Sequence, residues 1–317
     1  MCHRLLTPFP LPRFGPFLPT RLLPGPMEGV TTGNFLRLLT RHRWTQAWWT
    51  PFLRISTAVP RRARLAAWLA PYRETSLPLI VQIMGTDKEK LVDAARLLRE
   101  LGADAIDLNC ACPSEIVVRN GAGGARLKEP RWMGETLEAL KEKLDCPVGI
   151  KMRTGLQDPQ EFPQALAPML KAAQPDFLTL HFRTVQEAYR PVPRGWERLA
   201  QARELLPDLP LVGTGDLFTP QDARQMAQRC GVDAIAPARG LLQNPRLLMD
   251  IQDSLRGNPT KPWNNREKLA LLQELQQDHA PLGFLLQMAA NLLGKDSSAF
   301  QDFLQAQRHA STPTTTP

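Results

Sequence analysis

Short apolar runs alternate with longer amphipathic stretches along most of this chain, and this alternation limits the possible folds more than any other feature. Apolar runs of about four to eight residues are typical of buried strands, whereas apolar residues spaced by three or four are typical of helices. The pattern predicts eight strands, at 22–27, 47–53, 79–84, 105–109, 148–152, 177–181, 211–214 and 232–236. It predicts helices at 88–101, 131–144, 159–173, 196–206 and 220–229, and a short one after Asn244-Pro245.

Eight strand–helix units over roughly 225 residues match a (β/α)8 barrel, which typically needs about 250 residues, better than an open doubly wound sheet. An open sheet that binds a dinucleotide would carry a Gly-x-Gly-x-x-Gly turn. The loop Gly121-Ala122-Gly123-Gly124 has Arg126 at the third glycine position, and the chain has no Gly-Lys-Ser/Thr phosphate loop. The predicted fold class is therefore α/β, a TIM barrel.

Both ends of the chain depart from this pattern. From about residue 260 the alternation gives way to helical stretches at 265–277, 280–294 and 297–309, with six basic and six acidic residues between 251 and 317. Proline and arginine dominate 1–20, where prolines interrupt the apolar residues too often for a signal peptide. We predict an irregular extension at 1–20, a barrel domain at 21–255, a small helical bundle at 256–310 and a disordered tail at 311–317.

Positive charge is concentrated near the N-terminus. Residues 1–73 hold eleven arginines and one acidic residue, Glu28, whereas the whole chain carries a net charge of +8. A concentrated arginine surface favours a polyanion such as nucleic acid, because neutralised phosphates release counterions. Charge alone leaves open a surface that only improves solubility, or a basic tail.

Composition also bounds the environment of the chain. No apolar run approaches the roughly 18–20 residues that a membrane helix needs, and the mean hydropathy is −0.27. The five cysteines form neither a disulfide framework nor paired Cys-x-x-Cys metal knuckles. We expect a cytoplasmic protein without a membrane segment or a metal site.

Polar residues close the predicted strands. In a TIM barrel the active site lies at the C-terminal ends of the strands, so these residues should converge on one rim. A single lysine or histidine at a strand end is commonly structural, but several ends with polar residues favour a site. The residues are Gln82, Asn109, Cys112, Lys151, Arg153, His181, Arg183, Gly215, Asp216 and Arg239.

The residue types suggest the chemistry. A thiol in a barrel-top loop, such as Cys112, can act as a general acid or nucleophile, although a redox or purely structural role is also open. Lys151 would bring a cation suited to an anionic flavin or a phosphate, and His181 a hydrogen-bond donor. The loops at 212–216 and 238–240 follow the seventh and eighth strands, where barrels commonly bind phosphate. The pattern favours a phosphorylated cofactor.

Five segments together resemble one family. They are Pro26-Met27-Glu28-Gly29-Val30, Val81-Gln82-Ile83-Met84-Gly85, Asp107-Leu108-Asn109-Cys110-Ala111-Cys112-Pro113-Ser114, Lys151-Met152-Arg153-Thr154-Gly155 and His181-Phe182-Arg183-Thr184. Their order and spacing over 22–245 closely resemble the tRNA-dihydrouridine synthases. The Met-Glu-Gly segment, the Asn-Cys-x-Cys-Pro-Ser loop and Tyr189 look most like the bacterial C-type subfamily.

The resemblance implies an FMN enzyme that uses NADPH, or NADH, to reduce a uridine in the tRNA D-loop, at position 16 by subfamily, to 5,6-dihydrouridine. It implies that Cys112 is the proton donor, that the C-terminal helices bind tRNA, and that no obligate protein partner is needed. It places Asn109, Lys151, Arg153 and Arg183 near the uridine or the RNA. The residues that it places around FMN are Pro26, Met27, Gln82, Lys151, His181, Thr214, Gly215, Asp216, Ala238, Arg239 and Gly240.

Three positions depart from the family pattern. Thr214 stands where the family usually has Asn, Ala238 where it usually has Gly, and Pro51 where the subfamily tends to have an acid. The first two fall in the expected phosphate site and could weaken FMN binding. They keep open a flavin-free tRNA-binding paralogue. A second alternative is another FMN-barrel reductase that acts on a small molecule.

Overall fold

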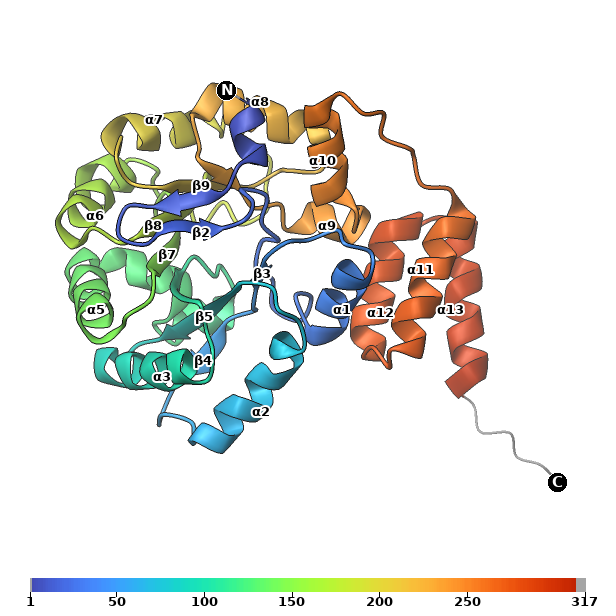
Figure 1. Cartoon of the computed structure of the whole chain (residues 1–317), viewed down its shortest axis with the longest axis horizontal. Coiled ribbons are helices and arrows are strands. Elements are labelled where there is room, and N and C mark those ends of the chain that lie inside the picture. The colour runs from blue at the N-terminus through green and yellow to red at the C-terminus, as the bar shows by residue number, and fades with distance from the viewer. Residues whose placement is uncertain (1, 312–317) are drawn as a thin grey trace.

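A parallel sheet that curls into a barrel forms the centre of the molecule (Figure 1). The computed structural model describes residues 2–311. The strands pair in the order β10-β9-β8-β7-β6-β5-β3, and β4 also pairs with β5. They are β3 (Trp48–Trp49), β4 (Leu53–Ile55), β5 (Leu79–Gly85), β6 (Ala105–Cys110), β7 (Val148–Arg153), β8 (Phe177–His181), β9 (Leu211–Thr214) and β10 (Ala234–Ile235). This architecture confirms the predicted α/β barrel.

Prolines explain where the strands are shorter than predicted. The predicted strand at 22–27 is reduced to a parallel bridge between Leu22 and Ile235, continued by the Gly25 amide, which donates to the Pro237 carbonyl. Pro24 and Pro26 have no N–H group to donate to a ladder. The predicted strand at 47–53 is likewise divided into β3 and β4, with Pro51 between them.

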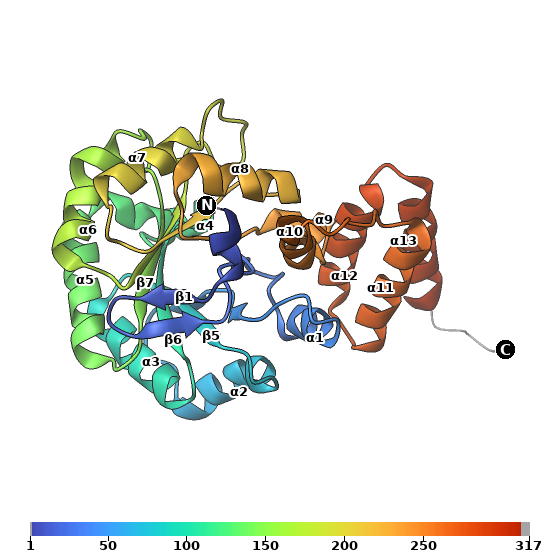
Figure 2. The same cartoon turned by 45° about the horizontal axis from the view of Figure 1, so that its top comes forward.

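Helices surround the sheet and connect its strands (Figures 1 and 2). Helix α3 shows why they form: Asp87 caps it by accepting from the Lys90 amide, and one apolar face of the helix is buried. The buried residues are Leu91, Ala94, Ala95 and Leu98. The helices are α1 (Gly33–Arg41), α2 (Arg62–Arg73), α3 (Lys88–Glu100), α4 (Glu115–Arg119), a 3₁₀ helix (Gly123–Lys128), α5 (Pro130–Lys143), a π-helix (Phe162–Leu166), α6 (Ala167–Ala173), α7 (Glu197–Leu205), α8 (Pro220–Cys230), α9 (Arg239–Gln243) and α10 (Leu247–Arg256).

The N-terminal segment closes one end of the barrel. A 3₁₀ helix (Cys2–Leu6) precedes an antiparallel hairpin of β1 (Phe9–Leu11) and β2 (Gly15–Leu18). Phe9, Leu11 and Leu18 are each 1% exposed and pack against residues at the start of the barrel strands, among them Ala105 and Phe177. The irregular extension predicted at 1–20 is therefore wrong for this hairpin. Its prolines hide the strand pattern, yet the apolar side chains between them are buried.

Three further helices lie beside α1 and α9 (Figures 1 and 2). They are α11 (Asn265–Gln277), α12 (Leu282–Ala289), which continues as a π-helix (Ala290–Gly294), and α13 (Ser298–Ser311). Arg41 binds Asp278 at 2.8 Å, and the Asn34 amide donates to the Asp278 carbonyl at 2.7 Å, so α1 anchors the bundle. Apart from Ser311, the tail predicted at 311–317 lies outside the described residues. No helix within 2–311 is long and apolar enough to cross a membrane.

Candidate active site

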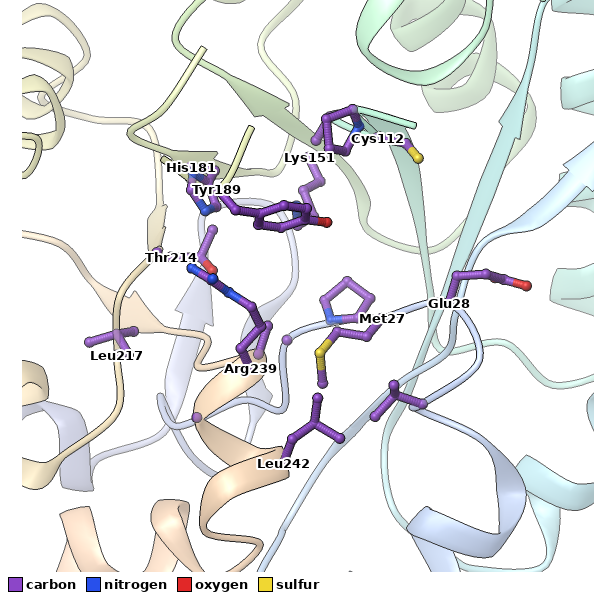
Figure 3. Close-up of a pocket in the computed structure, with 18 of the residues that line it drawn as sticks. Met27, Glu28, Cys112, Lys151, His181, Tyr189, Thr214, Leu217, Arg239 and Leu242 are labelled. Carbon is purple, nitrogen blue, oxygen red and sulfur yellow. The ribbon is translucent and has the colours of Figure 1, made fainter. Parts of the chain in front are cut away.

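A cavity of about 670 Å³ opens at the C-terminal ends of the barrel strands. Its volume lies within the roughly 300–1,000 Å³ of small-molecule sites. Figure 3 shows side chains from several strands and loops around it, with Lys151, His181 and Arg239 on one side. The cavity brings together every predicted site residue except Arg183. They are Pro26, Met27, Gln82, Asn109, Cys112, Lys151, Arg153, His181, Thr214, Gly215, Asp216, Ala238, Arg239 and Gly240.

His181, at the end of β8, is a neutral hydrogen-bond donor. Its Nδ1 accepts from the backbone amide of Arg183 at 3.2 Å. Burial, followed by the charges of Arg153 and Lys151, lowers the pKa of His181 well below its usual value. The imidazole is therefore uncharged at neutral pH and carries its proton on Nε2. It lines the cavity as an N–H donor.

Arg183 does not line the cavity, in contrast to the prediction that it contacts RNA. It is 2% exposed, and its guanidinium binds both oxygens of Asp216, at 2.9 and 2.6 Å. Arg239 binds the same carboxylate at 3.0 Å and lies over the ring of Tyr189, 5.0 Å from its centroid. Arg183 therefore holds Asp216, which in turn holds Arg239 at the cavity.

The turn after β9 needs a glycine. Gly215 has a φ of +112°, and a Cβ there would come within 2.6 Å of the Phe182 ring. Asp216 follows, also with a positive φ of 49°. At Gly240 a Cβ would come within 2.1 Å of the Leu217 carbonyl oxygen. The two loops predicted to bind phosphate are therefore tightly packed. The loop after β9 contacts the segment that follows β8, and the loop at Gly240 contacts the segment that follows β9.

Two cations lie on the C-terminal half of β7, close to the cavity. Lys151 is half-buried, and burial together with the nearby Arg153 charge lowers its pKa to about 8. Burial lowers the pKa of Arg153 to about 10. Arg153 is 4% exposed and donates to the carbonyls of Ala111 and Thr184, at 2.9 Å each. It braces two loops, whereas Lys151 has no hydrogen-bond partner within the described residues and is the more available cation.

Cys110, the last residue of β6, and Cys112, in the loop that follows, have different surroundings. Cys110 is fully buried, and burial raises the pKa of its thiol. Cys112 is half-buried and lines the cavity. Its backbone amide and that of Ala111 both donate to Asn109 Oδ1, at 3.1 and 3.0 Å. Of the two, only Cys112 can present its sulfur to a ligand in the cavity.

Thr214 and Ala238, the two residues of the expected phosphate site that depart from the family pattern, are each accommodated by a nearby residue. The Thr214 hydroxyl donates to the Ala236 carbonyl at 2.8 Å, and the residue is 3% exposed. The Cβ of Ala238 lies toward Gly25, where an added Cβ would come within 3.0 Å of it. A glycine at 25 leaves the room that the alanine at 238 requires.

Several lining residues were absent from the predicted site. Glu28 and Tyr189 belong to the quoted motifs but had no role assigned there. Gln287 and Asn291 come from the C-terminal bundle, on α12 and the π-helix. The four-residue spacing of two carboxamides within an otherwise apolar helix was the signal that could have found them.

Ion pairs occupy many of the N-terminal arginines. Arg4 binds Asp233, Arg13 binds Asp176 and Arg41 binds Asp278. Arg37, Arg62 and Arg73 likewise bind Glu74, Glu100 and Asp104. Among residues 2–311, the exposed Arg43, Arg54, Arg61 and Arg64 have no ion-pair partner. The basic segment is therefore several separate surfaces and internal contacts rather than one face.

The fold and the cavity define a class: a β/α-barrel enzyme whose site combines a thiol, a desolvated lysine and a neutral imidazole. Comparison with known families is more specific. Residues 22–292 match the family model described as dihydrouridine synthase. The chain belongs to the dihydrouridine synthase family.

Curated relatives span most of the chain. A tRNA-dihydrouridine(16) synthase of Neisseria meningitidis is 31% identical over 252 residues, 76% of this chain and 74% of the relative. The tRNA-dihydrouridine synthase B of Pseudomonas aeruginosa is 30% identical over 274 residues, 84% and 80%. The tRNA-dihydrouridine(16) synthase of Escherichia coli is 30% identical over 261 residues, 80% and 81%.

Proposed function

We propose that this protein reduces a uridine of tRNA, at position 16 of the D-loop, to 5,6-dihydrouridine, with FMN as cofactor and NADPH, or NADH, as reductant. The observation that carries the proposal is Cys112 beside Lys151 in one cavity of a chain that belongs to the dihydrouridine synthase family. Two similar relatives are named tRNA-dihydrouridine(16) synthases.

The cavity suits an anionic, planar cofactor with a phosphate. Arg239 and the loops at Thr214–Asp216 and Ala238–Gly240 would hold the phosphate, and Gln82, Lys151 and His181 would bind the ring system, between Pro26 and Met27. The neutral imidazole of His181 suits a carbonyl oxygen as its acceptor. When bound, reduced FMN supplies a hydride.

The protein's own groups complete the reduction. The pyrimidine gains a hydride at carbon 6 and a proton at carbon 5, and Cys112 donates that proton from its thiol. Negative charge develops toward the uracil carbonyl as the hydride arrives, and Lys151 stabilises it within a largely desolvated site. Arg153 keeps the Cys112 loop in place through its bond to the Ala111 carbonyl. Asn109 lies next to the target base.

The RNA must present an unstacked base to this cavity. Extrusion of a base costs a few kcal/mol, which contacts to the RNA backbone have to offset. The exposed Arg54, Arg61 and Arg64 lie where β4 and α2 meet the rim, and they would bind phosphates. The bundle adds Gln287 and Asn291 to the cavity wall, so it would contact the nucleotides around the target. We place this activity in the cytoplasm, without an obligate protein partner.

An absorption spectrum of the purified protein, followed by anaerobic NADPH addition, tests the cofactor. We expect flavin bands that bleach with NADPH, and sequencing of dihydrouridine in tRNA from a deletion strain should then show the loss of one position. A protein that stays colourless after FMN is supplied but binds tRNA would favour the flavin-free paralogue instead. Bleaching without any change in tRNA would favour reduction of a small molecule.

A further inference from the structure

A chain of hydrogen bonds runs under the cavity from a buried carboxylate to the loop that carries Cys112. Gln82 on β5 and Asp107 on β6 are paired across the two strands. Gln82 Nε2 donates to Asp107 Oδ2 at 2.6 Å, and Asn109 Nδ2 donates to Gln82 Oε1 at 2.7 Å. Asn109 Oδ1 accepts the backbone amides of Ala111 and Cys112. Gln82, Asp107 and Asn109 are 1%, 0% and 6% exposed.

The direction of this chain is set at its two ends. Backbone N–H groups only donate, so the oxygen of Asn109 must face the Cys112 loop and its NH₂ group must face Gln82. The oxygen of Gln82 therefore faces Asn109, and its NH₂ group needs an acceptor on the other side. An ionised carboxylate, which only accepts, supplies that acceptor at Asp107.

The buried carboxyl of Asp107 does not stabilise the fold. Burial raises its pKa to about 7, against the contributions of Gln82, Lys151 and Trp49, which lower it. The Trp49 indole faces this carboxyl, but no hydrogen bond of ordinary geometry joins its nitrogen to Asp107 Oδ1, and neither atom has another partner within the described residues. A buried carboxyl with an unpaired oxygen costs stability. Its direct effect is on the amide of Gln82.

We propose that Asp107 is a positioning residue, which orients the amides of Gln82 and Asn109 and thereby holds the Cys112 loop in its functional conformation. Asp107 acts on the loop of the reacting thiol through these two residues, and separately its charge raises the pKa of Lys151. The catalytic consequence rests on the proposed role of Cys112, whereas the structural effect on the loop does not.

An asparagine at 107 would not replace the carboxylate. If its oxygen faced Gln82, its NH₂ group would lie on the side of the Trp49 indole, which lowers the pKa of Asp107 as a donor does. If its NH₂ group faced Gln82, both amides would have to turn, and Asn109 would present its NH₂ group to two backbone N–H groups. Either arrangement sets donor against donor.

Exchanging the carboxylate and the amide restores the direction. In the double variant Gln82→Glu/Asp107→Asn, the asparagine NH₂ group donates to the new carboxylate, and its oxygen faces the indole N–H. The carboxylate at 82 accepts from Asn109, which still accepts from the Cys112 loop. Gln82→Glu alone would place two carboxylates against each other and should fail.

Hydrogen exchange of the Ala111 and Cys112 amides, measured by mass spectrometry on the full chain, is the direct test. Asp107→Asn should lose about tenfold or more of the protection at these two amides, and the double variant should recover most of it. Asp176→Asn is the matched control: Asp176 is 4% exposed but accepts from Val148 at the opposite end of β7. It should leave the two amides protected even if it lowers global stability.

Turnover separates this inference from the proposed function. We expect kcat to fall in Asp107→Asn, with KM for tRNA unchanged. The double variant is judged by amide exchange alone, because Gln82 is among the residues proposed to bind the flavin ring. Unchanged protection in Asp107→Asn, or a double variant that does not fold or stays unprotected, overturns the positioning role. If Asp107→Asn itself does not fold, a folded and protected double variant supports the role. Hydrogen exchange at the two amides could follow the prediction while kcat of Asp107→Asn stays unchanged. That result would support the positioning of the loop by Asp107 and would count against Cys112 as the proton donor.

Discussion

The two ends of the barrel are built from the same strands, but one end is a closed apolar cluster and the other is an open polar cavity. At the hairpin end, Ala105 and Phe177 pack against β1 and β2 in a closed apolar cluster. At the other end of the same two strands, Asn109 and His181 line an open cavity. In a parallel barrel all strands point the same way, so one end collects every loop that follows a strand. One end is thus free to stabilise the fold, and the other to bind.

The comparison also explains the distribution of charge. Arg4 and Arg13 bind the buried Asp233 and Asp176 near the hairpin end, where they attach the N-terminal segment to the barrel. Arg183 and Arg239 share Asp216 at the rim, where they shape the cavity. Arginines near the hairpin therefore serve packing, whereas a rim arginine such as Arg239 keeps part of its guanidinium available.

The largest effect should follow a change at the rim. Cys112→Ala removes the proposed proton donor, and we expect dihydrouridine formation to slow about 10²- to 10⁴-fold, the usual contribution of a general acid. Flavin binding and oxidation of NADPH should stay intact, because the thiol is not needed for either. Single-turnover reduction of tRNA measures the loss, and Cys110→Ala, which changes a buried thiol two residues earlier at the end of β6, is the control. An unchanged single-turnover rate in Cys112→Ala would remove this residue from the mechanism.

A change at the hairpin end should affect stability instead of chemistry. Phe9→Ala leaves a cavity in the cluster that closes the barrel, and we expect a loss of about 3 kcal/mol in the free energy of unfolding. Urea unfolding measures this loss. Phe14→Ala, which alters a half-buried ring of the same hairpin, should cost clearly less. Turnover per folded molecule should be unchanged, and a specific loss of activity in Phe9→Ala would mean that the two ends are coupled.

Much of the difference between the cavity end and the hairpin end of the barrel could be predicted from the sequence. Periodicity predicts the barrel and the helix at 265–277, and the polar residues at strand ends predict the polar rim of the cavity apart from Arg183. The wall residues on α12 and the π-helix do not follow from that pattern. The hairpin was missed because Pro10, Pro12 and Pro16 conceal its alternation. The strand-end position of Arg183 does not show whether its side chain faces the cavity or, as in the structure, the carboxylate of Asp216. Ion pairs of this kind join residues far apart in the chain, so the local sequence pattern does not predict them.

Arginines at the rim should bind RNA in a way that cations at the hairpin end do not. The triple variant Arg54→Glu/Arg61→Glu/Arg64→Glu should weaken tRNA binding about ten- to a hundredfold at low salt and flatten the dependence of affinity on salt. Lys143→Glu/Lys171→Glu/Arg229→Glu has the same net charge and alters exposed residues near the C-terminal ends of α5, α6 and α8. Fluorescence anisotropy with labelled tRNA compares the two. Equal losses in both variants would mean that net charge, and not the rim, governs binding.

The smallest expected effect concerns the proton on Lys151. Burial holds its pKa at about 8, below the value of 10.5 that a lysine has in an unfolded chain. Between these two pH values the unfolded chain binds a proton that the folded chain has released, so this lysine makes stability rise with pH. The difference in unfolding free energy between wild type and Lys151→Met, measured in urea without flavin, should therefore move in favour of the wild type from about pH 7 to pH 10. Lys171→Met, which removes an exposed lysine near the hairpin end, corrects for the loss of a lysine as such. A flat difference would show that Lys151 keeps its proton when the protein folds, and the rim would then be better hydrated than its contrast with the hairpin end implies.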